Sequence, residues 1–142
     1  MIRFKPGALF FDSKLVMSSV DRATRRVLAK FGAFVRRTAK SSIRKRKKPS
    51  APGNPPSSHT GLLKKFIWFG YEPQHQSVVI GPKQLTQNKR GAAPPLLEHG
   101  GVGTFRRKKK LRRVRYHPRP FMGPALDKEQ PKLSAMWRDS VN

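Results

Sequence analysis

The side chains best suited to catalysis or metal binding are histidines, acids and hydroxyl groups, and their spacing favours neither activity. The histidines are His59, His75, His99 and His117. None of them stands four residues from a second ligand on a predicted helix, which is the spacing that would place two ligands on one face. Glu98 is the only acid between Glu72 and Asp127, so no convergent acid–base pair is evident for a small hydrolase. The hydroxyl candidates are Ser57, Ser58 and Thr60, and they also lack a base at a recognisable spacing. We therefore predict a protein that is not an enzyme and has no cofactor or metal.

Two runs of cations carry the functional signal. Five consecutive cations occupy positions 44–48, and eight of the ten residues from 106 to 115 are cationic. The members are Arg44, Lys45, Arg46, Lys47, Lys48, Arg106, Arg107, Lys108, Lys109, Lys110, Arg112, Arg113 and Arg115. Lysine and arginine on exposed segments neutralise phosphates whatever the base sequence. We predict contact with nucleic-acid phosphates; acidic surfaces of neighbouring proteins and a solvated cationic face are the alternatives.

Base recognition has little support. Phe105 and Tyr116 are the only aromatic residues that flank the second run, so base stacking is poorly provided for. The first run has no nearby acid to pair with, because none occurs between Arg22 and Tyr71.

Composition sets the class of protein. The 142 residues include 32 lysines and arginines against seven acids, a formal charge of +25, which predicts a polyanionic partner. The hydrophobic share of 36% suffices for one modest core, so we expect a single domain over 1–142. Cysteine is absent, which excludes disulfides and thiolate sites. Neither a membrane-spanning run nor a signal peptide is evident, and we expect a soluble protein made inside the cell.

The strongest periodic pattern predicts a long amphipathic helix over 13–44, after an N-terminal arm at 1–12. Apolar residues recur there at steps of three and four residues: Val16, Val20, Ala23, Val27, Phe31, then Phe34 or Val35, and Thr38 or Ala39. The spacing indicates one core-facing stripe along the whole helix.

A proline-rich segment at 49–60 follows the helix, and its four prolines exclude helix and central strand. We predict a rigid, exposed, extended arm that touches neighbouring subunits; an interdomain linker is the alternative. The apolar run at 62–69 predicts a strand, and 70–73 predicts a turn. A second strand at 76–80 then completes an antiparallel hairpin.

The last third of the chain predicts a short helical turn near 94–99, begun by proline and stopped by glycine. We expect a flexible basic loop over 102–115, with strand-like ends and a possible third strand at 112–116. A C-terminal helix follows position 121, kinked or split at Pro131. Trp68, Phe69, Phe121 and Trp137 are expected in the core. The predicted fold is α+β, with the long N-terminal helix and the C-terminal helix packed on a small antiparallel sheet.

Four segments in order resemble one family. They are 50–56 with Thr60, Gly61, Leu62 and Ile67; 78–82; 95–101; and 119–126, which reads Arg-Pro-Phe-Met-Gly-Pro-Ala-Leu. Together they resemble the neck and tail-completion proteins (minor tail proteins) of tailed bacteriophages, over roughly 14–140. The resemblance implies a small α+β protomer that forms a ring at the head–tail joint and is not an enzyme. The extra charge at 44–48 and 106–115 departs from the family, as does His99, where an aromatic residue is common.

The resemblance also implies partners and a location. We expect a homo-oligomeric ring of six or twelve copies around the DNA channel of the virion neck or upper tail, assembled in the host cytoplasm. Its neighbours would be head-completion or portal-side proteins, tail-terminator or tail-tube proteins, and genomic DNA. Residues expected at subunit interfaces are Pro52, Pro55, Pro56, Glu98, His99, Arg119, Phe121 and Met122. A general basic nucleic-acid-binding module, ribosomal or nucleoid-like, is the alternative.

Overall fold

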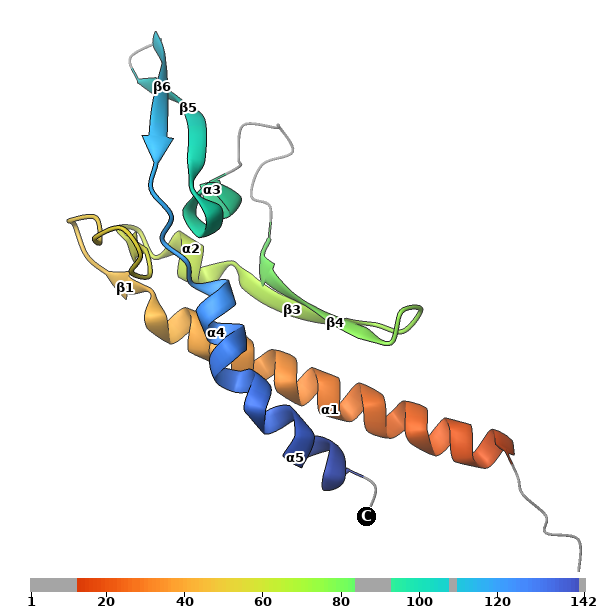
Figure 1. Cartoon of the computed structure of the whole chain (residues 1–142). Helices are drawn as coiled ribbons and strands as arrows, with labels where there is room; N and C mark the ends of the chain where they lie inside the picture. The colour runs from red at the N-terminus through yellow and green to blue at the C-terminus, as the bar shows by residue number, and fades with distance from the viewer. Residues whose placement is uncertain (1–12, 84–92, 108–109, 141–142) are drawn as a thin grey trace, which may run out of the picture.

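Helix α1 (Ser13–Ser42) forms the spine of the molecule (Figure 1). The computed structural model describes residues 13–83, 93–107 and 110–140, so the expected arm at 1–12 lies outside the described residues. Val27, Phe31, Val35 and Ala39 follow one another at four-residue steps and are buried, as the periodicity predicts. Val16 and Val20 continue the same stripe but are 46% and 55% exposed, so the core covers only the C-terminal part of the helix.

The long helix ends two residues earlier than predicted. Ile43 is almost completely buried, and beyond it the short strand β1 (Arg44–Lys45) pairs in parallel with β2 (Ser57–Ser58). An extended backbone at Arg44 brings Ile43 into the core and ends the helix.

The Pro-rich segment is not a projecting arm, which corrects the prediction. Pro56 is among the most deeply buried side chains, and Ser58 is buried with its hydroxyl accepting the amide of Gly61 at 2.9 Å. The pairing of β2 with β1 adds backbone contacts to the same domain. Proline excludes helix here, but it does not prevent the chain from folding back as a loop.

Strands β3 (Ile67–Glu72) and β4 (Ser77–Pro82) form the predicted antiparallel hairpin. Its start was predicted wrongly, because the backbone at 62–65 is one helical turn, α2 (Leu62–Lys65), preceded by Gly61 at φ 79°. The hairpin turn lies at 73–76, not 70–73. The inner face packs on α1 so closely that a Cβ on Gly32 would lie 2.8 Å from Val78.

Trp68 is 54% exposed and lies outside the core, contrary to the prediction. Strand alternation explains this, because Ile67 and Phe69 point inward toward α1 and Trp68 therefore points outward. The Arg36 guanidinium lies 5.4 Å from the Trp68 ring centroid, and Arg36 Nε donates to the Ile67 carbonyl at 2.8 Å.

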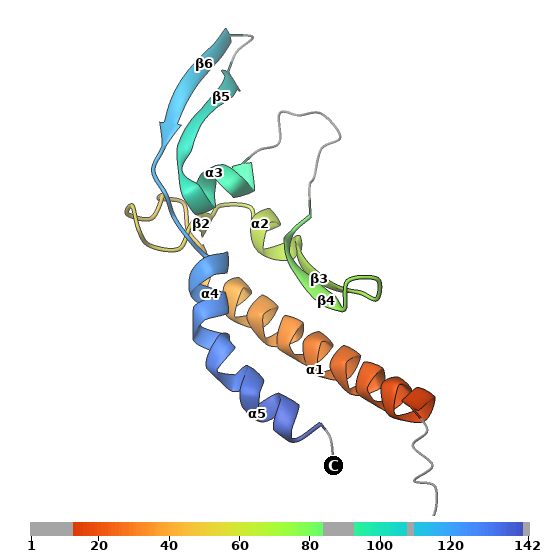
Figure 2. The same cartoon turned by 45° about the vertical axis from the view of Figure 1, so that its right-hand side comes forward.

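The C-terminal helix is split at Pro131, as predicted. Helix α4 (Met122–Glu129) passes into a short 3₁₀ segment, η1 (Gln130–Lys132), and then into α5 (Leu133–Arg138). Both views show α4 and α5 running beside α1, with the β3–β4 hairpin on another side of it (Figures 1 and 2).

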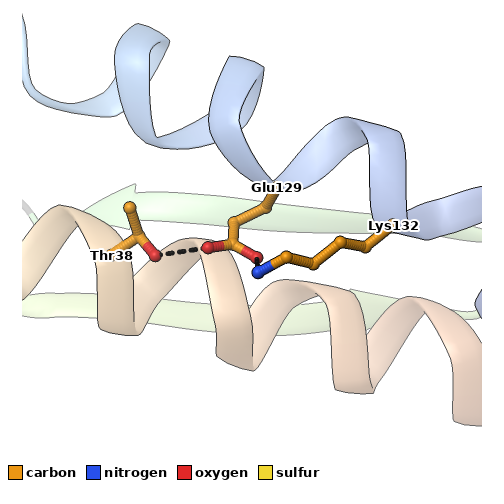
Figure 3. A network of polar contacts seen from close by, with 3 residues as sticks. All are labelled: Thr38, Glu129 and Lys132. Carbon is orange, nitrogen blue, oxygen red and sulfur yellow. Dashed lines mark hydrogen bonds and ion pairs between the residues drawn. The ribbon is translucent and has the colours of Figure 1, made fainter.

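A polar network fastens α4 to α1 (Figure 3). The Thr38 hydroxyl donates to Glu129 Oε1 at 2.6 Å, and Lys132 Nζ donates to Glu129 Oε2 at 2.6 Å. The Glu129 side chain is buried, and these two hydrogen bonds, that from Lys132 first, hold its pKa below the usual value.

The remaining strands confirm the strand predicted at 112–116 and correct the rest of the expected basic loop. Helix α3 (Ala93–His99) matches the predicted helical turn, and β5 (Gly101–Arg107) and β6 (Lys110–Tyr116) form a second antiparallel hairpin. The fold is α+β, as predicted. Its described strands form separate two-stranded sheets instead of one sheet.

The core lies where α1, the inner face of β3–β4 and α4 meet. Its buried members are Phe31, Val35, Ala39, Ile43, Ile67, Phe121 and Ala125. Within the described ranges, no helix has the length and apolar character needed to span a bilayer.

Candidate nucleic-acid interface

The β5–β6 hairpin extends away from the helical body in both views (Figures 1 and 2). Its two strands have seven residues each. At about 3.4 Å per residue they give a projection of roughly 20 Å. Such a hairpin can reach a partner that the core does not touch.

Cations lie on both faces of this hairpin. The register pairs Arg112 with Phe105, Arg113 with Thr104 and Arg115 with Val102. Because successive residues of a strand alternate, Arg113 and Arg115 share one face and Arg112 lies on the other. Lys110 and the three arginines are all exposed. The three arginines stand opposite uncharged residues, which limits like-charge repulsion across the ladder.

One of the two faces is exposed wherever its side chains are described. The face that includes Gly103 and Tyr116 packs on α3 at its base, where a Cβ on Gly103 would lie 2.7 Å from Leu96 and 2.9 Å from Tyr116. Arg112 belongs to this face, and Arg113 and Arg115 belong to the opposite one. The face with Arg113 and Arg115 therefore points away from the body and is the better placed for a large partner.

The fold brings the two cationic runs to the same end of the molecule. The Pro-rich loop that follows 44–48 is tied to the segment that follows β6 by two hydrogen bonds. The Gly53 amide donates to the Pro118 carbonyl at 2.9 Å, and Arg119 Nε donates to the Ser50 carbonyl at 2.9 Å. Arg44, Lys45, Arg46, Lys47 and Lys48 are all exposed. No ion pair involves either run in the described part of the chain, where the ion pairs are those of His75, Lys132 and Arg138.

Glu98 fixes the base of the hairpin and has an intramolecular role. Its Oε2 accepts the amides of Phe121 at 2.9 Å and Met122 at 3.0 Å, and its Oε1 accepts the amide of Gly123 at 2.8 Å. These are amides at the start of α4, where a carboxylate is favoured by the unpaired donors and the helix dipole. Glu98 thus joins α3 to α4 within its own chain, and its place at a subunit interface stays a prediction.

Two other expected interface residues belong to the interior. Phe121 is 1% exposed in the core, and Pro56 is equally buried, so neither side chain is available to a neighbouring subunit. Arg119 is half-buried and bonds to Ser50. Met122 and Pro55 are half-buried, whereas Pro52 and His99 are exposed. Only Pro52 and His99 keep the exposure expected of interface residues.

A third cationic group is formed by the fold. Burial lowers the pKa of Lys40, and the charges of Arg36 and Lys64 lower it further. Arg36 and Lys40 lie one helical turn apart, so their proximity was readable from the sequence. Lys64 joins them only because α2 turns back along α1, and no local pattern reveals that.

The histidines remain scattered. All four are exposed, and His75 Nδ1 lies 3.4 Å from Glu72 Oε2. In the described ranges, no three histidine or acidic side chains gather as metal ligands would.

Comparison with known proteins gives no assignment. No family model, curated protein or solved structure matches the chain.

Proposed function

We propose that the chain is a structural virion protein of a tailed phage, a ring-forming neck or tail-completion component that joins head and tail around the DNA channel. The observation that carries the proposal is the projecting β5–β6 hairpin, whose Arg113 and Arg115 lie on the face turned away from the body. The resemblance of four sequence segments to tail-completion proteins supplies the setting, and the hairpin supplies the contact with DNA.

The physics of the hairpin supports a polyanionic neighbour. Beyond its base, which packs on α3, the hairpin has no further strand or layer; a two-stranded hairpin of this kind is marginally stable in water, and like charges weaken it further. Phosphates along a DNA path would neutralise those charges and stabilise the projection. Contacts of this kind are independent of base sequence, as passage of a whole genome requires.

A general nucleic-acid-binding module of the ribosomal or nucleoid kind is the alternative, and the same charges support it. The two functions differ in where the chain is found. A virion component occurs in several copies per particle, whereas a nucleoid or ribosomal protein is found with the host's own nucleic acid.

Particle analysis tests the proposal. We expect purified phage particles to contain six or twelve copies by quantitative mass spectrometry, and image reconstruction to place them at the head–tail joint. Replacing Arg112, Arg113 and Arg115 with glutamine should give particles that lose DNA or fail to join heads to tails. The matched control replaces the exposed residues Lys30, Lys65 and Lys128 with glutamine, which removes the same charge elsewhere and should leave particles intact. Absence of the chain from purified particles would refute the proposal.

A further inference from the structure

The outer face of the β3–β4 hairpin contains two glycines that the chain itself does not require. Gly70 and Gly81 lie inside the strands, and neither has positive φ. A Cβ at either position would meet no atom within 4 Å. Glycine in a strand interior is destabilising by roughly 0.5–1 kcal/mol relative to alanine. Such glycines often mark the place where another backbone approaches closely.

The same face exposes large apolar side chains beside the glycines. Trp68 stands opposite Gly81, and Val79 stands opposite Gly70. Trp68 and Val79 are 54% and 55% exposed, so the two glycines leave a shallow hollow between apolar walls. Exposed apolar surface arranged around a hollow is typical of an interaction site.

A second unpartnered apolar surface lies on the N-terminal part of α1. Val16 and Val20 line a groove between α1 and α5, together with Ala23 and Trp137. Val16 and Val20 remain 46% and 55% exposed in the groove. They continue the stripe whose C-terminal part is covered by α4 and the inner face of β3–β4.

We propose that these two surfaces bind each other between copies of the chain, with the outer face of one copy's β3–β4 on the N-terminal stripe of the next copy's α1. The inference deepens the proposed function, and it rests on that function because it requires copies of the chain to assemble. The hairpin would then lie between two helices, its inner face on its own α1 and its outer face on the neighbour's.

The dimensions of the two surfaces agree. Val16 and Val20 are separated by four residues of helix, or about 6 Å at 1.5 Å per residue. Gly70 and Gly81 stand diagonally across the strand pair, where such positions are about 7–8 Å apart. Two valines of one copy can therefore occupy the two gaps of the other.

The charges agree as well. Glu72, which is 52% exposed, is the charged residue on the outer face of the two strands, and Lys83, just after β4, lines the opposite end of the hollow. The groove on α1 is lined by Arg22 and Arg26. Glu72 of one copy can therefore pair with Arg22 or Arg26 of the next, at the end of the hollow away from Lys83.

The contact joins two different surfaces, so it is heterologous and can close into a ring. A ring of this kind needs both surfaces on every copy. One substitution can therefore disrupt the outer face of β3–β4 and leave the stripe on α1 intact, and a second can do the reverse.

Sedimentation velocity of the full chain tests the inference, in salt that screens the net charge. We expect the wild-type chain to self-associate, and Val79→Lys and Val20→Lys each to raise the dissociation constant more than about tenfold. An equimolar mixture of the two variants should form a two-copy species, because one variant keeps the stripe and the other keeps the hairpin face. Gln74→Lys, in the exposed turn of the same hairpin, adds the same charge and should associate like the wild type.

The variant Gly70→Val should weaken association without destabilising the fold. Valine favours strands and has free space at this position, so the thermal midpoint should stay the same or rise. Its side chain fills the hollow, so association should weaken by about tenfold or more.

The inference is overturned if the wild-type chain is monomeric at every concentration, if either lysine variant or Gly70→Val associates normally, or if the mixture fails to pair. The proposed function is judged separately, on particles. Several copies per particle combined with any of these results would reject only this contact.

Discussion

Neutralising the free face of the β5–β6 hairpin should change how DNA binding depends on salt. The perturbation is the double variant Arg113→Gln, Arg115→Gln. Both side chains are exposed on the face turned away from α3, and neither has an acidic partner in the described residues. Their loss should therefore remove phosphate contacts without disturbing the body of the protein.

The magnitude follows from counterion release. Each phosphate contact contributes about 0.9 to the slope of log K against log salt, so two contacts contribute about 1.8. Since the counterion contribution vanishes near 1 M salt, the variant should bind about 60-fold more weakly than the wild type at 0.1 M. Arg112→Gln should change the slope by less than about 0.9, because its face packs on α3 at the base.

Fluorescence anisotropy of a short labelled duplex, titrated at several salt concentrations, measures both slopes. Two duplexes of unrelated sequence should give equal affinities, because the contacts are with phosphates. The control variant Lys30→Gln, Lys128→Gln removes the same charge from exposed sites outside both cationic runs. An unchanged slope for the double variant, or an equal loss for the control, would refute the assignment of this face to DNA.

Three further predictions concern the body of the protein. Glu98→Ala should lower the free energy of unfolding by about 2 kcal/mol, because three amides lose their acceptor. Glu98→Gln should lower it by less, since the amide oxygen of glutamine can still accept. Urea denaturation measures both values, and an equal loss of stability in the two variants would contradict the reasoning. The pKa of Glu129 is lower in the folded state than in the unfolded chain. Its contribution to the free energy of unfolding is therefore complete above the unfolded pKa of about 4.3 and is lost as the pH falls through the folded pKa. Denaturation across this acid range should show that the free energy of unfolding of Glu129→Gln depends less on pH than that of the wild type. The same pH dependence in both proteins would count against the network. Gly32→Val should cost about 2 kcal/mol in a thermal melt, because the space is already filled by Phe69 and Val78, and wild-type stability would contradict the packing.

Local patterns predicted the elements whose determinants are close in sequence. The stripe through Val27, Phe31 and Val35 predicted α1, and Pro131 predicted the break between α4 and α5. The apolar run at 62–69 and the strand-favouring residues at 76–80 predicted the β3–β4 pair. The α+β class followed from these elements alone.

The errors arose where distant residues decide the structure. The Pro-rich loop is held by Pro118 and by Arg119, both more than 60 residues away from their partners Gly53 and Ser50. Cations occupy most positions of β6 on both faces, so the hairpin lacks the apolar–polar alternation that reveals a strand.

The site was predicted in part. The two cationic runs were found from composition, and both are exposed wherever their side chains are described. The hairpin geometry that divides Arg112 from Arg113 was not predicted, nor was the capping role of Glu98. That role depends on α3 and the start of α4 meeting in space, which a single sequence does not reveal.

The carboxylate of Glu98 also has a mechanical consequence. It lies between the foot of the basic hairpin and the first turn of α4, which in turn is fastened to α1 through Glu129. A sideways load on the hairpin tip would therefore pass into the helical frame through this side chain, together with the hydrogen bond from the Arg119 amide to the Leu97 carbonyl. Motion of the hairpin tip should therefore be accompanied by motion of α4.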